Sequence, residues 1–228
     1  MNQLFKLFQS GGIMMYPLFI ASVLAVAVIL ERYWTLHSIA HSGKKSLREI
    51  EEHIRNERWD EAMRLLETKS DPTSKTLLAG LVERKRGKQA MELAMEEAAR
   101  ESFPSLRHYL PILDTVITAA PLLGLLGTIT GLMGVFRVVA DKLSHNPHAD
   151  TSGITGGIAE SLIATATGIS IAVVALVFYN LFTAWNEAII TETERQATHL
   201  IRMITKSPDG ISTVIEDTQF KGEQGTVR

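Results

Sequence analysis

The chain has 228 residues, of which 46% are hydrophobic and only 7% aromatic, and its formal net charge is -2. The hydrophobic residues are gathered into uninterrupted runs, which predicts an integral membrane protein rather than one soluble domain. The slight negative charge argues against a dedicated nucleic-acid-binding protein, because neutralising phosphates needs a clear cationic surplus. The absence of cysteine excludes disulfides, thiolate metal sites and a cysteine nucleophile.

Three apolar stretches approach the length of about 20 residues that a membrane-spanning helix needs. They are Ile13–Leu30, Val116–Phe136 and Ser161–Asn186. The first also resembles a cleavable signal peptide, because Lys6 precedes it and Ala25-Val26-Ala27 lies within it. Its apolar run continues past that point and ends in Glu31-Arg32-Tyr33-Trp34. We therefore expect a retained span with Tyr33 and Trp34 as interfacial anchors and Arg32 snorkelling.

The distribution of cationic residues predicts the orientation of these spans. Of the 23 lysine and arginine residues, fifteen lie in residues 31–110 and five follow the third stretch. The positive-inside rule then places the loop between the first two spans and the C-terminus in the cytoplasm. The N-terminus and the link between spans two and three are expected outside.

The long loop has the pattern of a helical domain. Leu47, Ile50 and Ile54 recur at helical spacing. Asp71-Pro72, followed by Thr73 and Ser74, supplies a break and an N-cap for the next helix. Pro104 and Pro111 predict a kink or an interruption before the second span.

Helical spacing also continues beyond the third stretch, and Pro208-Asp209-Gly210 is expected to end it. The sequence thus predicts an all-α membrane protein with three spans and long cytoplasmic helical extensions. Its expected parts are an N-terminal segment (1–12), spans at 13–34, 111–137 and 158–185, a cytoplasmic helical domain (35–110), a periplasmic link (138–157), a cytoplasmic helical extension (186–206) and a mobile tail (207–228).

Small and hydroxyl-bearing residues share one face in each of the last two spans. In the second span Gly124, Thr128 and Gly131 are spaced by four and three residues, with Gly127 and Gly134 beside them. In the third span the corresponding face holds Ser161, Thr165, Gly168, Ala172 and Ala175. Such faces allow close helix packing, and a threonine can simply bond to the carbonyl one turn back. Either the two faces only pack, or the hydroxyls also line a pathway.

Several motifs in these spans resemble a known family. They are Met15-Tyr16-Pro17-Leu18, Ala120-Pro121-Leu122-Leu123-Gly124-Leu125-Leu126-Gly127-Thr128, and Gly157-Ile158-Ala159-Glu160-Ser161-Leu162 with Ala164-Thr165-Ala166. Their order and spacing are similar to those of the ExbB/TolQ branch of the MotA/TolQ/ExbB proton channel proteins, closest to ExbB. The resemblance covers roughly residues 13–36 and 107–185.

This resemblance implies a bacterial inner-membrane ring, a pentamer, whose second and third helices surround a pore. The pore would hold the membrane helices of a dimeric ExbD- or TolR-like partner that carries the proton-binding aspartate. Thr128 and Thr165 would line the pore, and Glu160 would lie near the proton entrance. Pro121, Gly124, Gly127, Gly131 and Gly168 would pack helices, whereas Thr130 and Thr167 match the family less securely. A TonB-like protein and membrane lipid are further implied partners, and no cofactor is implied.

Other residues leave alternatives open. Glu160 could instead be a stabilising group near a helix N-terminus, since the helix dipole favours a carboxylate there. Asp114 could be a proton exit or could pair with Arg107. His145 and His148, with Asp141 and Asp150, could bind a metal, but the link is short and polar, and we assign no metal site.

The function expected from this reading is a stator subunit that converts proton-motive force into work in the periplasm, energising TonB-dependent outer-membrane transport. A TolQ-like role in envelope maintenance and division is an alternative, as is a membrane scaffold or channel without a motor. No serine, histidine and carboxylate set indicates hydrolysis, and the chain is not expected to be an enzyme.

Overall fold

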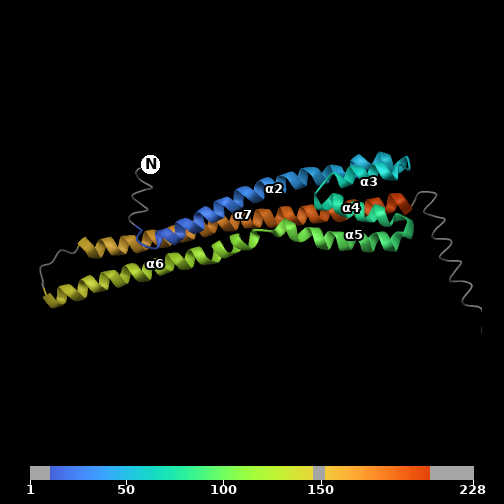
Figure 1. Ribbon diagram of the computed structural model, residues 1–228. Coiled ribbons are helices and arrows are strands. Elements are labelled where there is room, and N and C mark those ends of the chain that lie inside the picture. Colours follow the sequence, from blue (N-terminus) through green and yellow to red (C-terminus); the bar gives the residue numbers. More distant parts are fainter. Residues whose placement is uncertain (1–10, 146–151, 206–228) are drawn as a thin grey trace, which may run out of the picture. The chain divides into compact units, whose positions relative to one another are not determined.

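The computed structural model describes the backbone of residues 11–145 and 152–205, and every regular element within them is helical. The elements are α2 (Met15–Arg55), α3 (Trp59–Glu67), α4 (Pro72–Val82), the 3₁₀ helix η1 (Glu83–Arg86), α5 (Lys88–Ser102), the 3₁₀ helix η2 (Phe103–Arg107), α6 (Leu110–His145) and α7 (Ser152–Thr205), shown in Figure 1. The all-α prediction is confirmed for the described residues.

Within the described residues, three regions contain a helix that is long and apolar enough to cross a membrane. Their most apolar windows lie in Met15–Arg55, Lys88–Ala140 and Thr155–Thr205, and have mean hydropathies of 1.7, 1.8 and 2.2. Only 17% to 28% of the residues in these windows are buried within the chain. Large apolar side chains such as Leu122, Phe136 and Val177 are 60% or more exposed. Apolar surface of this extent is unfavourable in water, so lipid or other protein must cover it, as in an integral membrane protein.

The described chain forms two compact units. The membrane unit comprises the residues up to Tyr33 together with Tyr109–Phe182. The second unit comprises Trp34–His108 and the residues from Thr183 onward. The first part of α2, α6 and the first part of α7 therefore build one unit, and the short helices with the remainder of α2 and α7 build the other.

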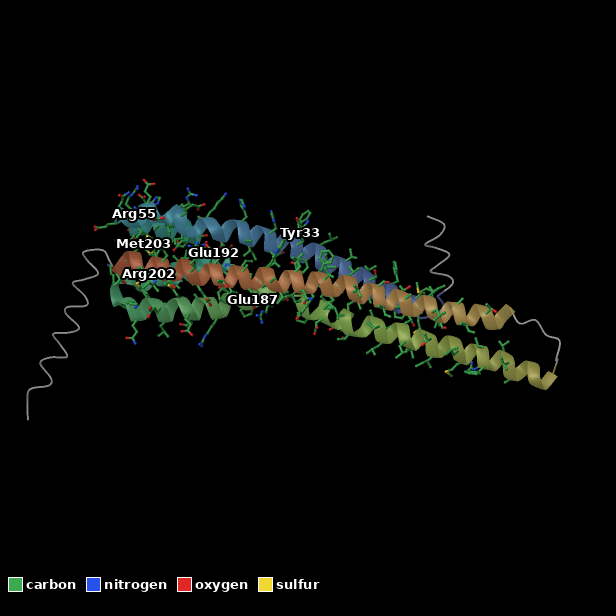
Figure 2. The ribbon with its side chains drawn as sticks, turned by 180° about the vertical axis from the view of Figure 1, so that it is seen from behind. Tyr33, Arg55, Glu187, Glu192, Arg202 and Met203 are labelled. Atoms are coloured by element: carbon green, nitrogen blue, oxygen red, sulfur yellow. The ribbon has the colours of Figure 1, made fainter. Side chains whose placement is uncertain are left out.

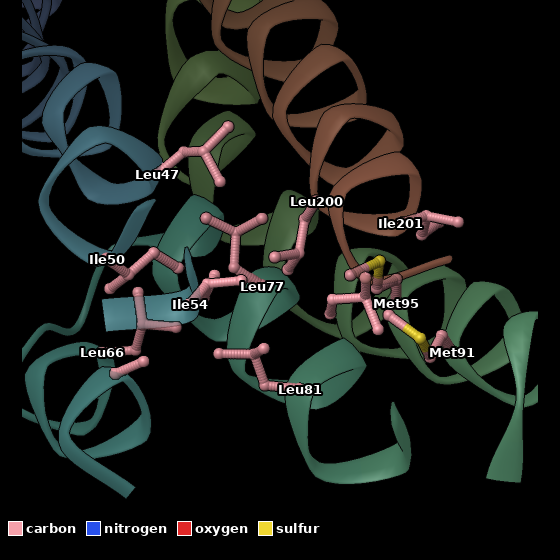
Figure 3. Packing of buried hydrophobic residues seen from close by; sticks show 12 residues of the cluster. Leu47, Ile50, Ile54, Leu66, Leu77, Leu81, Met91, Met95, Leu200 and Ile201 are labelled. Atoms are coloured by element: carbon pink, nitrogen blue, oxygen red, sulfur yellow. The ribbon is translucent and has the colours of Figure 1, made fainter. Parts of the chain in front are cut away.

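A hydrophobic cluster holds the second unit together (Figure 3). Each of its five α-helical segments contributes buried side chains: Leu47, Ile50 and Ile54 from α2, Ala62 and Leu66 from α3, Leu77 and Leu81 from α4, Met91 and Met95 from α5, and Leu200, Ile201 and Ile204 from α7. The helical spacing predicted for Leu47, Ile50 and Ile54 is confirmed by their burial. This cluster gives short helices, which are marginal alone, the tertiary packing that stabilises them.

The start of α4 is fixed by a buried carboxylate. Asp71 is the N-cap, as the sequence predicts, and its side chain accepts hydrogen bonds from the Ser74 backbone N–H and the Ser74 hydroxyl, both at 2.9 Å. The Ser42 hydroxyl donates a third hydrogen bond to it from α2, at 2.8 Å. A carboxylate that satisfies orphan amides at a helix start stabilises that helix. Asp71 therefore fixes both the start of α4 and its contact with α2.

A polar contact also joins α2 to α7 within the second unit. The amide nitrogen of Gln196 donates to the Gly43 carbonyl at 2.9 Å, and its amide oxygen accepts from the Leu47 N–H at 3.3 Å. In an α-helix these two backbone groups face each other one turn apart. The Gln196 amide nitrogen also donates to the Glu192 carboxylate at 2.8 Å, so Gln196, which is 1% exposed, has partners for its amide nitrogen and oxygen in the core. Figure 2 shows charged side chains of the same unit, including Arg55 on α2 and Glu192 and Arg202 on α7.

The predicted interruption before the second span is confirmed. Helix α5 ends at Ser102, η2 contains Pro104, and Tyr109 has a positive φ of 41° before α6 begins at Leu110. A positive φ is strained for an aromatic residue. The membrane helix thus starts as a separate element rather than as a continuation of α5.

The structure corrects the expectation for Arg32. The Arg32 side chain does not extend into solvent, because the residue is only 3% exposed. Its guanidinium donates to both carboxylate oxygens of Glu31 and lies 5.3 Å from the centroid of the Tyr109 ring. An ion pair and a cation–π contact compensate the burial of this charge. Tyr33 and Trp34, by contrast, are 46% and 76% exposed, as interfacial anchors must be.

Candidate functional site

The candidate site is built on a line of close backbone contact between α6 and α7, here called the α6–α7 seam. A Cβ atom on Gly124 would lie 2.9 Å from the Thr165 Cα, and one on Gly131 would lie 2.8 Å from the Ser161 Cβ. A Cβ on Gly168 would overlap the carbonyl oxygen of Ala120. Real Cβ atoms do not approach so closely, so only glycine allows these helices to meet at this distance.

Two further glycines, Gly127 and Gly157, also make close contacts between α6 and α7. A Cβ on Gly127 would lie 2.6 Å from the Ala164 Cβ, and one on Gly157 would lie 2.6 Å from a methyl group of Val135. Gly134, by contrast, has open space where a Cβ would be. Of the predicted packing residues, Gly124, Gly127, Gly131 and Gly168 thus lie in the seam. Pro121, which is half-buried, lies inside α6 without ending it.

Thr165 connects the two helices of the seam. Its hydroxyl donates to the Gly124 carbonyl on α6 at 2.9 Å and lies 3.4 Å from the Ser161 carbonyl on its own helix. The side chain is half-buried. Threonines in membrane helices commonly bond only to a carbonyl of their own helix. Thr165 differs, because its hydroxyl also joins α7 to α6.

The other three threonines that the sequence analysis names in these spans bond within their own helices. The Thr128 hydroxyl donates to the Leu125 carbonyl at 2.7 Å, and the Thr167 hydroxyl donates to the Ile163 carbonyl at 2.8 Å. Thr130 makes two contacts of 3.1 Å to backbone carbonyls of α6 and is exposed. Thr128 is half-buried beside the seam glycines, about one turn of α6 from Gly124 and one from Gly131.

These hydrogen bonds determine what Thr128 and Thr165 offer to a neighbouring group. Each hydroxyl has one proton, which it donates to a backbone carbonyl, and two lone pairs that can accept. In this state they can accept a hydrogen bond from a protonated carboxyl group. To solvate a carboxylate they must turn and donate, giving up the carbonyl. The pair can therefore adapt to both protonation states of a carboxyl group without titrating.

Glu160 precedes the seam residue Ser161 on α7, and the structure corrects one reading of it. Helix α7 begins at Ser152, before the predicted 158, so Glu160 is not in the first turn. The field of a helix terminus is significant only within the first turn, so stabilisation of the helix start does not explain this carboxylate. The Glu160 side chain is half-buried and lies against Gly12, a residue that the sequence analysis did not single out.

Two further sequence hypotheses concern the pairing of Asp114 with Arg107 and a metal site in the link between α6 and α7. Within the described residues, Arg107 makes an ion pair of 2.9 Å with Glu187 of α7, while Asp114 is exposed on α6. Figure 2 shows Glu187 on α7. The side chains of the candidate metal ligands Asp141, His145, His148 and Asp150 lie outside the described residues, as does the predicted helix end at Pro208-Asp209-Gly210.

The comparison with protein families identifies the chain. The model of the MotA/TolQ/ExbB proton channel family matches residues 67–195, which include the whole α6–α7 seam. The chain belongs to this family.

Individual family members agree with this assignment. The chain is 33% identical to the biopolymer transport protein ExbB-like 3 of Synechocystis sp. over 76% of this chain and 82% of that protein. It is 27% identical to the biopolymer transport protein exbB1 of Vibrio cholerae over 94% of this chain and 96% of that protein. A shorter match, 39% identical, covers 42% of this chain and 40% of the Tol-Pal system protein TolQ of Pseudomonas aeruginosa.

The family assignment and the three apolar helices together indicate an inner-membrane protein of the ExbB/TolQ type, with relatives named for both the ExbB and the TolQ systems. The family consists of proton-channel subunits rather than enzymes. The resemblance to this family that the sequence motifs indicated is confirmed.

Proposed function

We propose that this chain is the ring-forming subunit of a proton-driven stator, and that it energises TonB-dependent transport across the outer membrane. In this proposal five copies surround a pore, which holds the membrane helices of an ExbD- or TolR-like partner dimer. The partner supplies the membrane aspartate that takes up and releases the proton. The N-terminus and the link between α6 and α7 face the periplasm, and the second unit and the C-terminus face the cytoplasm.

The observation that carries the proposal is that the α6–α7 seam presents hydroxyl groups and no charged side chain. Between Val116 and Phe136, and between Ser161 and Asn186, the chain has no acidic, basic or histidine side chain. It therefore cannot pass protons by titration of such groups across the middle of the bilayer. Its polar groups there are mainly hydroxyls, of which those of Thr128 and Thr165 lie beside the glycine contacts between α6 and α7. Such a wall is suited to a carboxyl group supplied by another protein.

The energetics are sufficient for mechanical work. A proton that crosses the membrane releases about 2.3 kcal/mol per 100 mV of membrane potential. Protonation removes the charge of the partner's aspartate and with it most of the attraction to the surrounding hydroxyl dipoles. The partner helix is then free to move between two packings that differ by a few kcal/mol, about the size of the energy supplied. Thr128 and Thr165 accommodate both states because their hydroxyls can accept or donate.

Glu160 would act at the outer end of this pathway. It is a half-buried carboxylate adjacent to Ser161, which is part of the seam. A carboxylate at the mouth of an apolar pathway can collect protons from the periplasmic side and pass them inward. We therefore assign Glu160 to the proton entrance, and Thr128 and Thr165 to the wall beside the partner's carboxyl group.

The test uses the purified ring with its partner in liposomes. Replacing both threonines with valine (Thr128→Val, Thr165→Val) conserves their volume approximately and removes both hydroxyls. Proton flux driven by an imposed potential should be lost while the complex retains its intact mass. Thr130→Val is the matched control, because Thr130 is exposed and bonds to its own helix; this variant should behave like the wild type. Undiminished flux in the double variant would overturn the proposal.

A TolQ-like role in envelope maintenance and division is the second candidate, favoured by the 39% identity to TolQ over 97 residues of the chain. The partner that co-purifies separates the two roles. Mass measurement of the intact complex gives the copy number of both subunits. Finding no single-span partner, with a ring that conducts unaided, would instead favour a scaffold or channel without a motor.

A further inference from the structure

The turn that precedes α2 lies against Glu160. Gly12 has a positive φ of 69° and its carbonyl accepts a hydrogen bond from the Met15 N–H at 3.1 Å, where α2 begins. A Cβ on Gly12 would overlap the Glu160 carboxylate and would lie 2.7 Å from its Cδ atom. The carboxylate therefore rests directly on the Gly12 backbone, in space that only glycine leaves open.

The residues next to Gly12 place this turn beside the α6–α7 seam. A Cβ on Gly11 would lie 3.3 Å from a methyl group of Ile163, which follows Glu160 by about one turn of α7. A Cβ on Gly127 would lie 3.5 Å from the Met14 Cβ. The turn thus packs against both α6 and α7, and it covers one side of the Glu160 carboxylate.

We propose that Gly12 is a positioning residue for Glu160. The missing Cβ lets the carboxylate lie over the turn, and the turn closes one side of it, so that protons reach Glu160 only from the side that stays open. The carboxylate is the far end of a flexible side chain, so a methyl group on residue 12 would displace it rather than unfold the helices. This inference rests on the proposed role of Glu160 at the proton entrance.

The test is a double-mutant cycle in the full chain assembled with its partner in liposomes. Gly12→Ala is made in the wild type and in Glu160→Asp, whose side chain is one methylene shorter and leaves room for the new methyl group. The strain of an L-residue at positive φ is the same in both backgrounds and cancels. We expect Gly12→Ala to lower proton flux by about tenfold to a hundredfold in the wild type, since a misplacement of about 1 Å can cost up to about a hundredfold. It should have little effect in Glu160→Asp.

A second readout follows the carboxylate itself. A hydrophobic carbodiimide modifies accessible protonated carboxyl groups, and mass spectrometry of the peptide that contains Glu160 measures the rate. Displacement from the turn should make this labelling faster in Gly12→Ala. Gly11→Ala is the matched control, because its methyl group would meet mainly the flexible end of Met15. This control should retain wild-type flux and labelling.

Glu160→Gln separates failure of this inference from failure of the proposed function. If this variant conducts like the wild type, Glu160 has no role at the entrance and the inference falls with that role. Suppose instead that Glu160→Gln loses flux, but Gly12→Ala lowers flux equally in the wild type and in the Glu160→Asp background. The effect of Gly12→Ala then comes from backbone strain in the turn and not from displacement of the carboxylate. The positioning role of Gly12 is then refuted while the proposed function stands.

Discussion

The hydroxyl of Thr165 donates a hydrogen bond across 2.9 Å to the carbonyl oxygen of Gly124, which belongs to the facing helix. The bond is possible because Gly124 has no side chain: a Cβ there would lie 2.9 Å from the Thr165 Cα. Thr165 therefore contributes to the contact between α6 and α7 and also carries one of the two hydroxyls that we assign to the pore wall. Its packing role and its chemical role can be separated by substitution.

Thr165→Ser retains the hydroxyl, whereas Thr165→Val retains the shape. A hydrogen bond to a charged group contributes about 1.5 to 3 kcal/mol, so Thr165→Val should lower proton flux in liposomes by about tenfold to a hundredfold. Thr165→Ser should stay close to the wild type. Equal activity of the two variants, with both complexes intact by mass, would show that the hydroxyl is not used.

The glycines of the seam should not tolerate even alanine. A Cβ on Gly168 would overlap the Ala120 carbonyl, so Gly168→Ala forces α6 and α7 apart and should destabilise the protein by about 1 to 3 kcal/mol, the usual cost of overpacking. Gly134→Ala is the control: its Cβ has open space, and alanine is the better helix former by up to about 1 kcal/mol. Thermal unfolding in detergent should order the proteins, from most to least stable, as Gly134→Ala, wild type, Gly168→Ala. The reverse order for the two variants would contradict the close contact.

Asp71 should stabilise the start of α4. Asp71→Ala removes the acceptor for the Ser74 N–H, the Ser74 hydroxyl and the Ser42 hydroxyl, and should cost about 1 to 3 kcal/mol of local stability. Amide hydrogen exchange of α4 should become faster by the corresponding factor. Asp60→Ala, at an exposed position in the first turn of α3, should leave the exchange of α4 unchanged. Unchanged α4 exchange in Asp71→Ala would mean that its hydrogen bonds contribute nothing.

Truncating a side chain should lower the stability of the second unit only where that side chain is buried in the hydrophobic cluster. Leu77 is fully buried, so Leu77→Ala should cost about 2 to 5 kcal/mol. Leu93 lies on α5 but is 68% exposed, and Leu93→Ala should be nearly neutral. Guanidinium-induced unfolding measures both costs, monitored by the fluorescence of Trp59, which packs against the cluster, in a background with Trp34 and Trp185 replaced by phenylalanine. A large cost at Leu93 would indicate that another surface covers it.

The sequence predicts the type of each element well, for physical reasons that are local. Apolar runs of bilayer length can only be helices in lipid, the Asp71 cap follows from its side chain, and Pro104 cannot continue a helix interior. The core positions Leu47, Ile50 and Ile54 follow from helical period alone. These features depend on residues that are close in the chain.

Features that depend on residues far apart in the chain are not predictable in this way. The burial of Arg32 depends on where the Tyr109 ring lies, and the bond from Thr165 to Gly124 depends on the register between α6 and α7. The contact between Gly12 and Glu160 has no periodic signal, because a lone glycine before a helix is common. The start of α7 at Ser152 lies before the apolar stretch, so hydropathy alone does not indicate it.

The most direct test of the account asks which residues face the partner's carboxyl group. The chain has no cysteine, so a single cysteine can replace Thr128, Thr165 or Val174, the last at an apolar position that is 52% exposed and that we expect to face lipid. A second cysteine replaces the membrane aspartate of the co-purified partner, and a disulfide requires Cβ atoms about 3.5 to 4.5 Å apart. The account predicts oxidative cross-linking from positions 128 and 165 and none from position 174. Cross-linking from position 174 alone would contradict it.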